Sequence, residues 1–472
     1  MKSIFSKIPE KVNYFYTEKI DLKIVSYDNT FKKVMEIINT IRDMYSHAVP
    51  EKIRETIEKH FVPTDEEKKN NAEIPTPVAL VDEMLDKIPA EFWTTSKAVL
   101  EPCCGKGNFL LGIFDKFYDG LKEKYMDERE RCEVIITKCL YYADITHTNV
   151  FIATEILKRH IHFYTGQEEL DYSFNSYTGD TLLMKNQFEV VGFDAVIGNP
   201  PYNASGATGT GNTIWQNFTT TSLKKWLVPN GYLLFVHPPG WRKPDSHRGR
   251  YLKMFDMMTK ENQMLYLQIH GLKDGKKVFN CGTRYDWYLI EKLNKYKDTE
   301  ILDENNDKYV LDLNCFKWLP NSNITEISKL LATDNNAKCN IMYNTPYHSA
   351  LKKQMSLIQI DDYQFPCIHT TPKTEPRIMY SKVNNKGHFG VSKVIFGDSG
   401  IRNPIIDMEG KYGMTEHSMA IQVSSIDEAI NISNAIKSKK FDRIVKSCSF
   451  STYQIDWRMF KEFKVDFWKE FV

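Results

Sequence analysis

Apolar and polar positions follow two different rhythms between residues 72 and 298. Short apolar runs of strand length lie at residues 98–100, 139–143, 193–197, 231–237 and 287–290. Segments with helical spacing follow the first two runs, at residues 107–117 and 148–159. Strands that alternate with helices predict an α/β fold, with a doubly wound parallel sheet covered by helices on both faces. Such folds bind ligands at the carboxyl ends of their strands.

The two flanking regions show other patterns. Residues 1–71 are predicted to be mainly helical, because apolar side chains recur there at helical spacing: Val34, Ile37, Ile38 and Ile41. A charged stretch at residues 65–71 looks like a linker. Residues 299–472 carry short β-like runs at 377–383 and 391–396 and a helical stretch at 426–439. We therefore expect three parts: a helical region (1–71), an α/β domain (72–298) and an α+β domain (299–472).

Charge and hydropathy narrow the class of protein. The formal net charge is only +1, so a nucleic-acid partner would need positive charge concentrated in one place. The chain has no apolar run of about 18 residues, which predicts no membrane span. Residues 1–19 lack the apolar core of a signal peptide. We therefore expect an intracellular, cytoplasmic protein.

The cysteines point to neither zinc nor disulfides. Their number, nine, is odd, and none forms a Cys-x-x-Cys pair. This argues against a zinc ribbon and against a disulfide scaffold. We expect free thiols in a reducing compartment and no metal site.

A glycine-containing loop follows the first predicted strand and opens a helix. Its sequence is Glu101-Pro102-Cys103-Cys104-Gly105-Lys106-Gly107-Asn108-Phe109. Because Gly105 and Gly107 lack side chains, the backbone can turn tightly and approach a ligand closely. The helix N-terminus behind the loop offers unpaired N–H groups to a carboxylate. A plain structural turn would give the same pattern.

Two aspartates stand at strand ends further along the chain. Asp144 closes the second predicted strand, where an acid can accept hydrogen bonds from both ribose hydroxyls of a nucleoside cofactor. An acid at a helix N-terminus is the alternative. Asp180 follows Gly179 and could bind the amino group of the cofactor's adenine. A simple turn aspartate is nearly as good an interpretation of Asp180.

The segment Asn199-Pro200-Pro201-Tyr202 directly follows an apolar strand. Two consecutive prolines fix the backbone there. The turn holds the Asn199 side chain and the Pro200 carbonyl as neighbouring acceptors, with the Tyr202 ring beside them. This arrangement suits alkylation of an exocyclic amine, whose lone pair is delocalised into its ring. Two acceptors on the amine's N–H groups would turn the lone pair toward a methyl donor.

Together these motifs resemble the amino-methyltransferases that methylate the N6 atom of adenine in DNA. Their order resembles the gamma class, and the resemblance covers about half of the chain. It implies a Rossmann-like methyltransferase sheet, S-adenosylmethionine as cofactor, and double-stranded DNA with a flipped adenine as substrate. It also implies a C-terminal target-recognition domain, and the tail at residues 450–457 resembles methylases that accompany a restriction endonuclease.

The resemblance assigns roles to individual residues. Gly105 and Gly107 would line the amino-acid end of the cofactor, and their loop neighbours Glu101, Pro102, Asn108 and Phe109 are also expected to bind the cofactor. Thr76 and Pro77 lie in a segment that resembles the element contacting the methionine end. Asp144 would bind the ribose and Asp180 the adenine, and Ile145 is also expected among the cofactor-binding residues. The target base would be held by Asn199, Pro200, Pro201 and Tyr202. The segment at 231–238 resembles the strand after the catalytic turn.

DNA contacts are expected from residues outside these motifs. The segment from Phe279 to Lys292 resembles a later strand whose aromatic residue helps to hold the flipped base; Phe279 is either that residue or a core residue. A basic cluster that could neutralise phosphates consists of Arg242, Lys243, Arg248, Arg250 and Lys253. A second basic stretch lies at residues 437–446, and both could equally be solvated faces. The loop at 205–213 is rich in Gly, Ser and Thr and is expected to order on DNA binding.

Other functions share parts of this pattern. Protein glutamine methyltransferases contain the same turn, because an amide nitrogen poses the same chemical problem. Their resemblance stops at the core, and the region of about 170 residues after it favours a larger substrate. An RNA adenine methyltransferase and a non-catalytic methyltransferase subunit are the remaining alternatives.

Overall fold

A computed structural model of the protein describes residues 27–47, 52–60, 74–185, 187–204, 213–244, 251–293, 297–333, 335–399, 403–450 and 455–471. These residues divide into two compact units that interleave along the chain. Unit 1 comprises the described residues of Met1–Pro238, Glu261–Leu267 and Leu272–Thr299. Unit 2 comprises those of Pro239–Lys260, Gln268–Gly271 and Glu300–Val472. The expected division into three functional domains stays a prediction.

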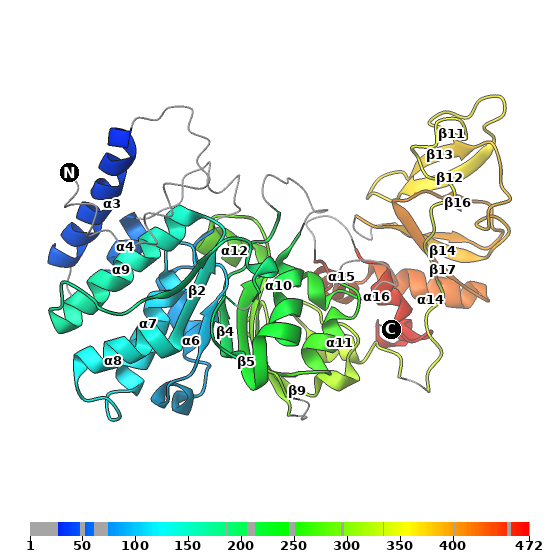
Figure 1. The fold of residues 1–472 in the computed structure, drawn as a ribbon. Helices are drawn as coiled ribbons and strands as arrows, with labels where there is room; N and C mark the ends of the chain where they lie inside the picture. Colours follow the sequence, from blue (N-terminus) through cyan, green and yellow to red (C-terminus); the bar gives the residue numbers. More distant parts are fainter. Residues whose placement is uncertain are drawn as a thin grey trace. The chain divides into compact units, whose positions relative to one another are not determined.

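Unit 1 is built around a twisted sheet (Figure 1). Its strands follow the spatial order β3-β2-β1-β4-β5-β7-β6. Their bounds are β1 (Val99–Glu101), β2 (Leu140–Asp144), β3 (Asn175–Thr178), β4 (Phe193–Gly198), β5 (Leu227–His237), β6 (Gln263–His270, of which 263–267 belong to unit 1) and β7 (Tyr285–Glu291). All five of the predicted strands are present. The α/β fold class is therefore confirmed.

The sheet is mixed and not wholly parallel as expected. Strands β1, β2, β3, β4 and β5 pair in parallel, whereas β7 pairs antiparallel with β5. The sequence could not reveal this direction, because β7 is mostly apolar and almost fully buried. A strand covered on both faces gives the same continuous apolar run in either orientation.

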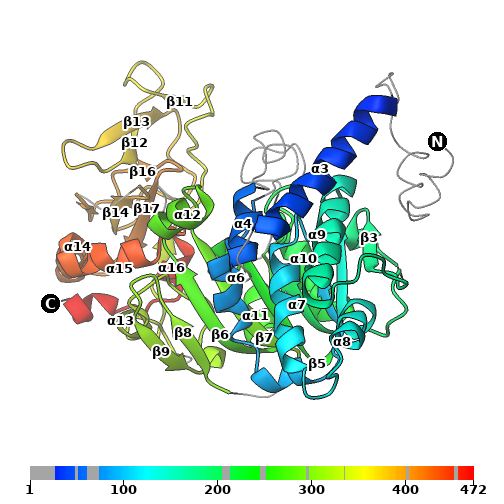
Figure 2. The ribbon, with the colours of Figure 1, turned by 90° about the vertical axis from the view of Figure 1, so that its left-hand side faces the viewer.

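The helices of unit 1 are α3 (Tyr27–His47), α4 (Ile53–His60), α6 (Val78–Leu85), α7 (Asn108–Gly120), α8 (Glu128–Val134), α9 (His147–Thr165), α10 (Trp215–Thr221) and α12 (Leu272–Phe279). Helix α3 lies along α9 (Figure 2). The Tyr45 hydroxyl of α3 is 3.1 Å from Nδ1 of the buried His160 of α9. The helical character predicted for the N-terminal region is confirmed in α3 and α4.

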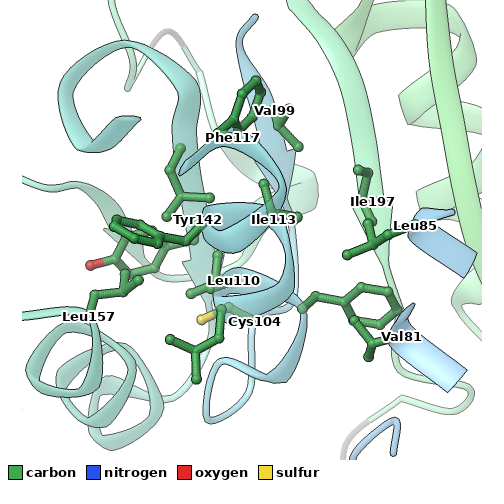
Figure 3. Packing of buried hydrophobic residues seen from close by; sticks show 14 of the residues in the cluster. Val81, Leu85, Val99, Cys104, Leu110, Ile113, Phe117, Tyr142, Leu157 and Ile197 are labelled. Carbon is green, nitrogen blue, oxygen red and sulfur yellow. The ribbon is translucent and has the colours of Figure 1, made fainter. Parts of the chain in front are cut away.

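The core of unit 1 fills the space between the sheet and these helices (Figure 3). Helix α7 contributes Leu110, Ile113 and Phe117, none of which is measurably exposed. They pack with Val81 and Leu85 of α6 and with residues of the sheet. Burial of one such side chain is worth roughly 1.5–3 kcal/mol. This packing fixes α7, and therefore the glycine loop at its N-terminus.

Unit 2 contains two four-stranded sheets and several helices. One sheet has the order β10-β17-β14-β15, with β10 (Ile341–Met342), β17 (Ser418–Gln422), β14 (Lys393–Gly397) and β15 (Ile405–Asp407). The other has the order β11-β13-β12-β16, with β11 (Met355–Ser356), β13 (Arg377–Ser381), β12 (Phe365–Thr370) and β16 (Gly413–Met414). Strands β8 (Thr299–Leu302, of which 300–302 belong to unit 2) and β9 (Lys308–Leu311) precede them. The helices are α11 (Met254–Thr259), α13 (Ile324–Ser328), α14 (Ile426–Lys437), α15 (Lys439–Ser447) and α16 (Arg458–Lys461).

The α+β character predicted for this region is confirmed. The runs at 377–383 and 391–396 form β13 and β14. The helical stretch at 426–439 continues into a second helix after Ser438. The Ser438 hydroxyl accepts a hydrogen bond from the Phe441 amide and so caps α15.

Two further expectations concern the whole described chain. No helix among the described residues has the length and apolarity needed to cross a membrane. All nine cysteines lie in the described part, where each is a free thiol.

Candidate functional site

A cavity of about 340 Å³ opens in unit 1 at the carboxyl ends of β1, β2 and β4. The predicted site residues that line it are Thr76, Glu101, Gly105, Asn108, Phe109, Asp144, Ile145, Asp180, Asn199, Pro200, Pro201 and Tyr202. Pro77, Pro102 and Gly107 belong to the same segments but do not line it. The topology explains the convergence, because the carboxyl ends of parallel strands meet at one edge of a sheet.

The glycine loop takes a backbone conformation that favours glycine. Gly105 and Gly107 have φ angles of +50° and +95°. Gly107 is the N-cap of α7. The loop is tied to β2, because the Cys104 amide donates to the Ala143 carbonyl at 2.8 Å. The Gly105 amide donates to Asp144 Oδ2 at 3.0 Å. This hydrogen bond fixes the loop to Asp144, the aspartate predicted to bind the ribose.

Asp144 is 8% exposed, and its carboxylate accepts hydrogen bonds from the Gly105 amide and from further donors. Besides Gly105, its carboxylate accepts from the Thr146 amide at 2.8 Å and from Asn149 Nδ2 at 3.3 Å. Burial raises the pKa of Asp144, while these hydrogen bonds lower it. A carboxylate has about four acceptor positions. The Thr146 side chain also hydrogen-bonds to this carboxylate, so Asp144 braces the loop, and a ligand hydroxyl would share an acceptor position with one of these donors.

Asp180 is exposed and begins a short 3₁₀ helix (Thr181–Leu183). Its Oδ1 accepts from the Leu182 amide at 3.0 Å, which is the turn geometry considered as the alternative interpretation. The residue also lines the cavity. The two interpretations are thus compatible, since only one carboxylate oxygen is used in the turn.

The Asn199 side chain is held in one orientation. Asn199 directly follows β4, and its Nδ2 donates to the Ile74 carbonyl at 3.1 Å. Its Oδ1 is buried and has no hydrogen-bond partner among the described residues. The amide nitrogen is therefore occupied, and the acceptor oxygen is left for a ligand.

Three more residues that line the cavity also carry a buried polar side-chain atom without a hydrogen-bond partner among the described residues. Thr76 Oγ1, Glu101 Oε2 and Tyr202 Oη have no partner in the described part of the chain. Burial raises the pKa of Tyr202, and burial together with the Asp144 charge raises that of Glu101. Buried polar atoms without partners are rare and costly. Four around one cavity indicate a polar ligand.

Several cavity residues were not predicted from the sequence. Glu58 comes from α4, Thr181 from the turn after Asp180, and Ile214 and Phe218 from the segment around α10. None of them belongs to a recognisable motif. They reach the cavity through tertiary packing, which no local sequence signal records.

The residues expected to contact DNA are placed differently. Arg242 is fully buried in unit 2, where its guanidinium donates to the carbonyls of Leu319 and Pro320 and to Asn321 Oδ1 at 2.8–3.0 Å. It is therefore a structural cation in this conformation, and the prediction of a phosphate contact is wrong for it. Lys243 is half-buried, and burial lowers its pKa. Arg248 and Arg250 lie outside the described residues, as do residues 205–212 of the predicted loop.

Phe279 does not line the cavity. It is the last residue of helix α12, not part of a strand. Its ring is buried in the core and packs edge-to-face on Tyr285, with ring centroids 4.8 Å apart. The core interpretation of Phe279 therefore fits the structure, and the strand that was expected at 279–292 begins only at Tyr285.

Several solved structures that are similar to this chain come from restriction-modification systems. MmeI, a type IIL restriction-modification enzyme in complex with DNA, is 8% identical, with 87% of this chain and 70% of MmeI covered and a TM-score of 0.52. LlaBIII, an ATP-dependent type ISP restriction-modification enzyme bound to DNA, is 12% identical, with 82% and 35% covered and a TM-score of 0.45. A modification subunit assigned to a type I restriction enzyme of Vibrio vulnificus YJ016 is 14% identical, with 55% and 53% covered and a TM-score of 0.37. The chain thus spans about half the length of the Vibrio protein.

At 8% identity the likeness to MmeI shows the fold alone, which is a mixed α/β fold. A search of curated proteins found no match. A family model does match part of the sequence, from residue 125 to residue 279. This part contains the Asn199–Tyr202 turn but not the glycine loop. Residues 125–279 of the chain are thus similar to the family described as Eco57I restriction-modification methylase.

Proposed function

We propose that this protein transfers a methyl group from S-adenosylmethionine to the N6 amino group of a flipped adenine in double-stranded DNA. One observation carries the proposal: Asn199 presents a buried acceptor without a partner among the described residues, beside a rigid Pro-Pro turn. An exocyclic amine has N–H groups that fit such an acceptor. A hydroxyl or thiol nucleophile would instead call for a general base.

The cavity suits the proposed cofactor. Gly105 and Gly107 let the backbone approach its amino-acid end, and Thr76 offers an unpaired hydroxyl there. Asp144 would take a ribose hydroxyl, and the exposed apolar side chain of Ile145 would cover the adenine, with Asp180 at the adenine's amino group. When bound, this cofactor supplies a methyl group on a positively charged sulfur, which even a weak nitrogen nucleophile can attack.

The protein's own contribution is to orient the target amine. Asn199 Oδ1 and the Pro200 carbonyl each accept one N–H, which pulls the nitrogen out of conjugation with the ring. The Ile74 carbonyl keeps the Asn199 amide from rotating. The Tyr202 ring would stack on the base and offset part of the few kcal/mol that flipping costs. The methylated nitrogen is acidic, so its proton leaves without a dedicated base.

DNA is the substrate that the fold supports best. MmeI, whose fold is similar over 87% of this chain, is a restriction-modification enzyme whose structure was determined with DNA. In this proposal unit 2 recognises the DNA sequence, and a restriction endonuclease could be the companion activity. The family model matched over residues 125–279 also describes restriction-modification enzymes.

The test is methyl transfer to three substrates: genomic DNA that lacks N6-methyladenine, RNA, and a glutamine-containing peptide. Nucleosides and peptide are then analysed by mass spectrometry. We expect N6-methyladenine in DNA alone. Asn199→Ala should lower the rate at least about 100-fold, by analogy with the loss of one group that stabilises a transition state. Asn217→Ala, an exposed asparagine on α10, is the matched control and should be fully active.

The other outcomes separate the alternatives. Methylation of RNA or of the glutamine peptide alone would replace DNA as the substrate. Equal activity of wild type and Asn199→Ala would contradict the role of the turn. Cofactor binding without transfer to any substrate would favour a non-catalytic subunit.

A further inference from the structure

Helix α4 lies ahead of the predicted α/β domain, yet it contributes Glu58 to the cavity. The helix is fixed in place by its own side chains. Ile53 and Ile57 are 3% and 1% exposed. Arg54 Nη1 pairs with Asp82 Oδ1 of α6 at 2.6 Å. Glu58 is therefore held at the cavity by packed structure.

The Glu58 carboxylate is attached to the segment Ile74–Val78 at the edge of the cavity. Its Oε2 accepts from the Val78 amide at 3.1 Å. Two further hydrogen bonds hold the same segment: Asn108 Nδ2 donates to the Thr76 carbonyl at 2.9 Å, and Asn199 donates to the Ile74 carbonyl. Glu58 thus lies near the unpaired Thr76 hydroxyl, where the amino-acid end of the proposed cofactor is expected.

That end of the cofactor carries an ammonium group, which forms its strongest hydrogen bonds with an ionised acceptor. Four carboxylic acids line the cavity, and three of them suit this role poorly. Burial favours the neutral form of Glu101, by raising its pKa. Asp144 already holds three donors. Asp180 lies beside Leu182, at the end assigned to the adenine. Glu58 is half-buried and uses one oxygen for a single amide, so its carboxylate keeps acceptor capacity.

Resting on the proposed function, we infer that Glu58 binds the α-ammonium group of the methionine portion of the cofactor. The helical region ahead of the sheet is then part of the cofactor site. The same carboxylate serves the N-terminus of α6, where a negative charge is favourable. One side chain thus links the fold of the edge segment to recognition of the ligand.

The test compares two ligands by calorimetry on the full chain. S-adenosylhomocysteine carries the ammonium group, whereas 5′-methylthioadenosine contains the nucleoside and sulfur but no amino acid. We expect Glu58→Gln to weaken S-adenosylhomocysteine about tenfold, the typical effect of losing a charged hydrogen bond. Binding of 5′-methylthioadenosine should be unchanged. Glu55→Gln, an exposed acid on the same helix, is the control and should alter neither affinity.

The glutamine variant keeps an oxygen for the Val78 amide, so it should fold, and thermal unfolding without ligand verifies this. Equal weakening of both ligands would show that Glu58 acts only by shaping the cavity and would overturn the inference. Unchanged binding of S-adenosylhomocysteine would also overturn it. If the wild type binds neither ligand, the proposed function itself fails, which is a different result from either of these.

Discussion

Replacing Thr76 by valine should stabilise the protein and weaken its cofactor binding at the same time. Thr76 is 3% exposed, and its hydroxyl has no partner among the described residues. Valine has nearly the same shape but carries a methyl group in place of the hydroxyl. The Thr76 carbonyl accepts a hydrogen bond from Asn108 Nδ2. This contact is retained in the variant, because it does not involve the Thr76 side chain.

The expected magnitudes follow from this geometry. A buried polar atom without a partner costs about 1–3 kcal/mol, so its removal should raise the free energy of unfolding by about 1 kcal/mol or more. For a unit of this size, that corresponds to a rise in Tm of about 2–4 °C. If the hydroxyl binds the cofactor, the variant loses that hydrogen bond, and the affinity should fall about fivefold to tenfold.

The assay is thermal unfolding with and without S-adenosylhomocysteine, together with calorimetry of binding. Thr181→Val is the matched control, because Thr181 is also 3% exposed but donates to the Pro102 carbonyl at 2.8 Å. It should lower the free energy of unfolding by about 1 kcal/mol, the opposite sign. If Thr76→Val is destabilised like the control, or if it binds the ligand as the wild type does, the reasoning about unpaired atoms is refuted.

Three further predictions concern the glycine loop, a buried cation of unit 2 and a buried histidine of the unit 1 sheet. Gly107→Ala should lower the free energy of unfolding by about 1–2 kcal/mol in urea titrations, because its φ of +95° is unfavourable for a residue with a side chain; an unchanged midpoint would contradict this. Arg242→Ala should lower the free energy of unfolding of unit 2 by about 3 kcal/mol or more, because it removes a buried cation that donates hydrogen bonds to three acceptors. A stable variant that binds DNA more weakly would instead support a contact between Arg242 and phosphate. Burial lowers the pKa of His237 to about 3, so the unfolded chain takes up this proton below about pH 6.5 while the folded chain does not. The free energy of unfolding should therefore fall as the pH drops from 7 to 5, and less steeply in His237→Gln; equal slopes would rule this out.

The sequence predicts the structure most accurately where residues that are neighbours in the chain form one element or one motif. The strands that end at Glu101 and Asp144 and the strand that precedes Asn199 are all predicted, because each is a short apolar run ended by a turn signal. Most of the predicted site residues line one cavity, because the topology brings the ends of these strands together. The order of the strands in the chain was enough to predict this convergence.

Long-range packing is what the sequence could not show. Arg242 and an exposed arginine look alike in a run of basic residues, although the structure buries Arg242. Phe279 is the last residue of α12, shortly before β7 begins. An apolar residue at such a place is compatible with a helix and with a strand. Glu58 has no motif around it and precedes the glycine loop by more than 40 residues. Its place at the cavity depends on how α4 packs against α6.

The identity of residue 199 follows from two demands that the structure makes on one short side chain. It must donate to the Ile74 carbonyl, and it must also present an acceptor toward the cavity. Asparagine meets both demands, because its amide carries a donor and an acceptor on the same carbon. An ionised aspartate would set a carboxylate oxygen against the Ile74 carbonyl, and serine has a single oxygen, which could not place the donor and the acceptor at two separate positions. Since Ile74 belongs to the segment that Asn108 and Glu58 also hold, the orientation of the Asn199 amide depends on contacts from α7 and α4. The proposed acceptor is thus set by parts of the chain on both sides of the glycine loop, not by the turn alone.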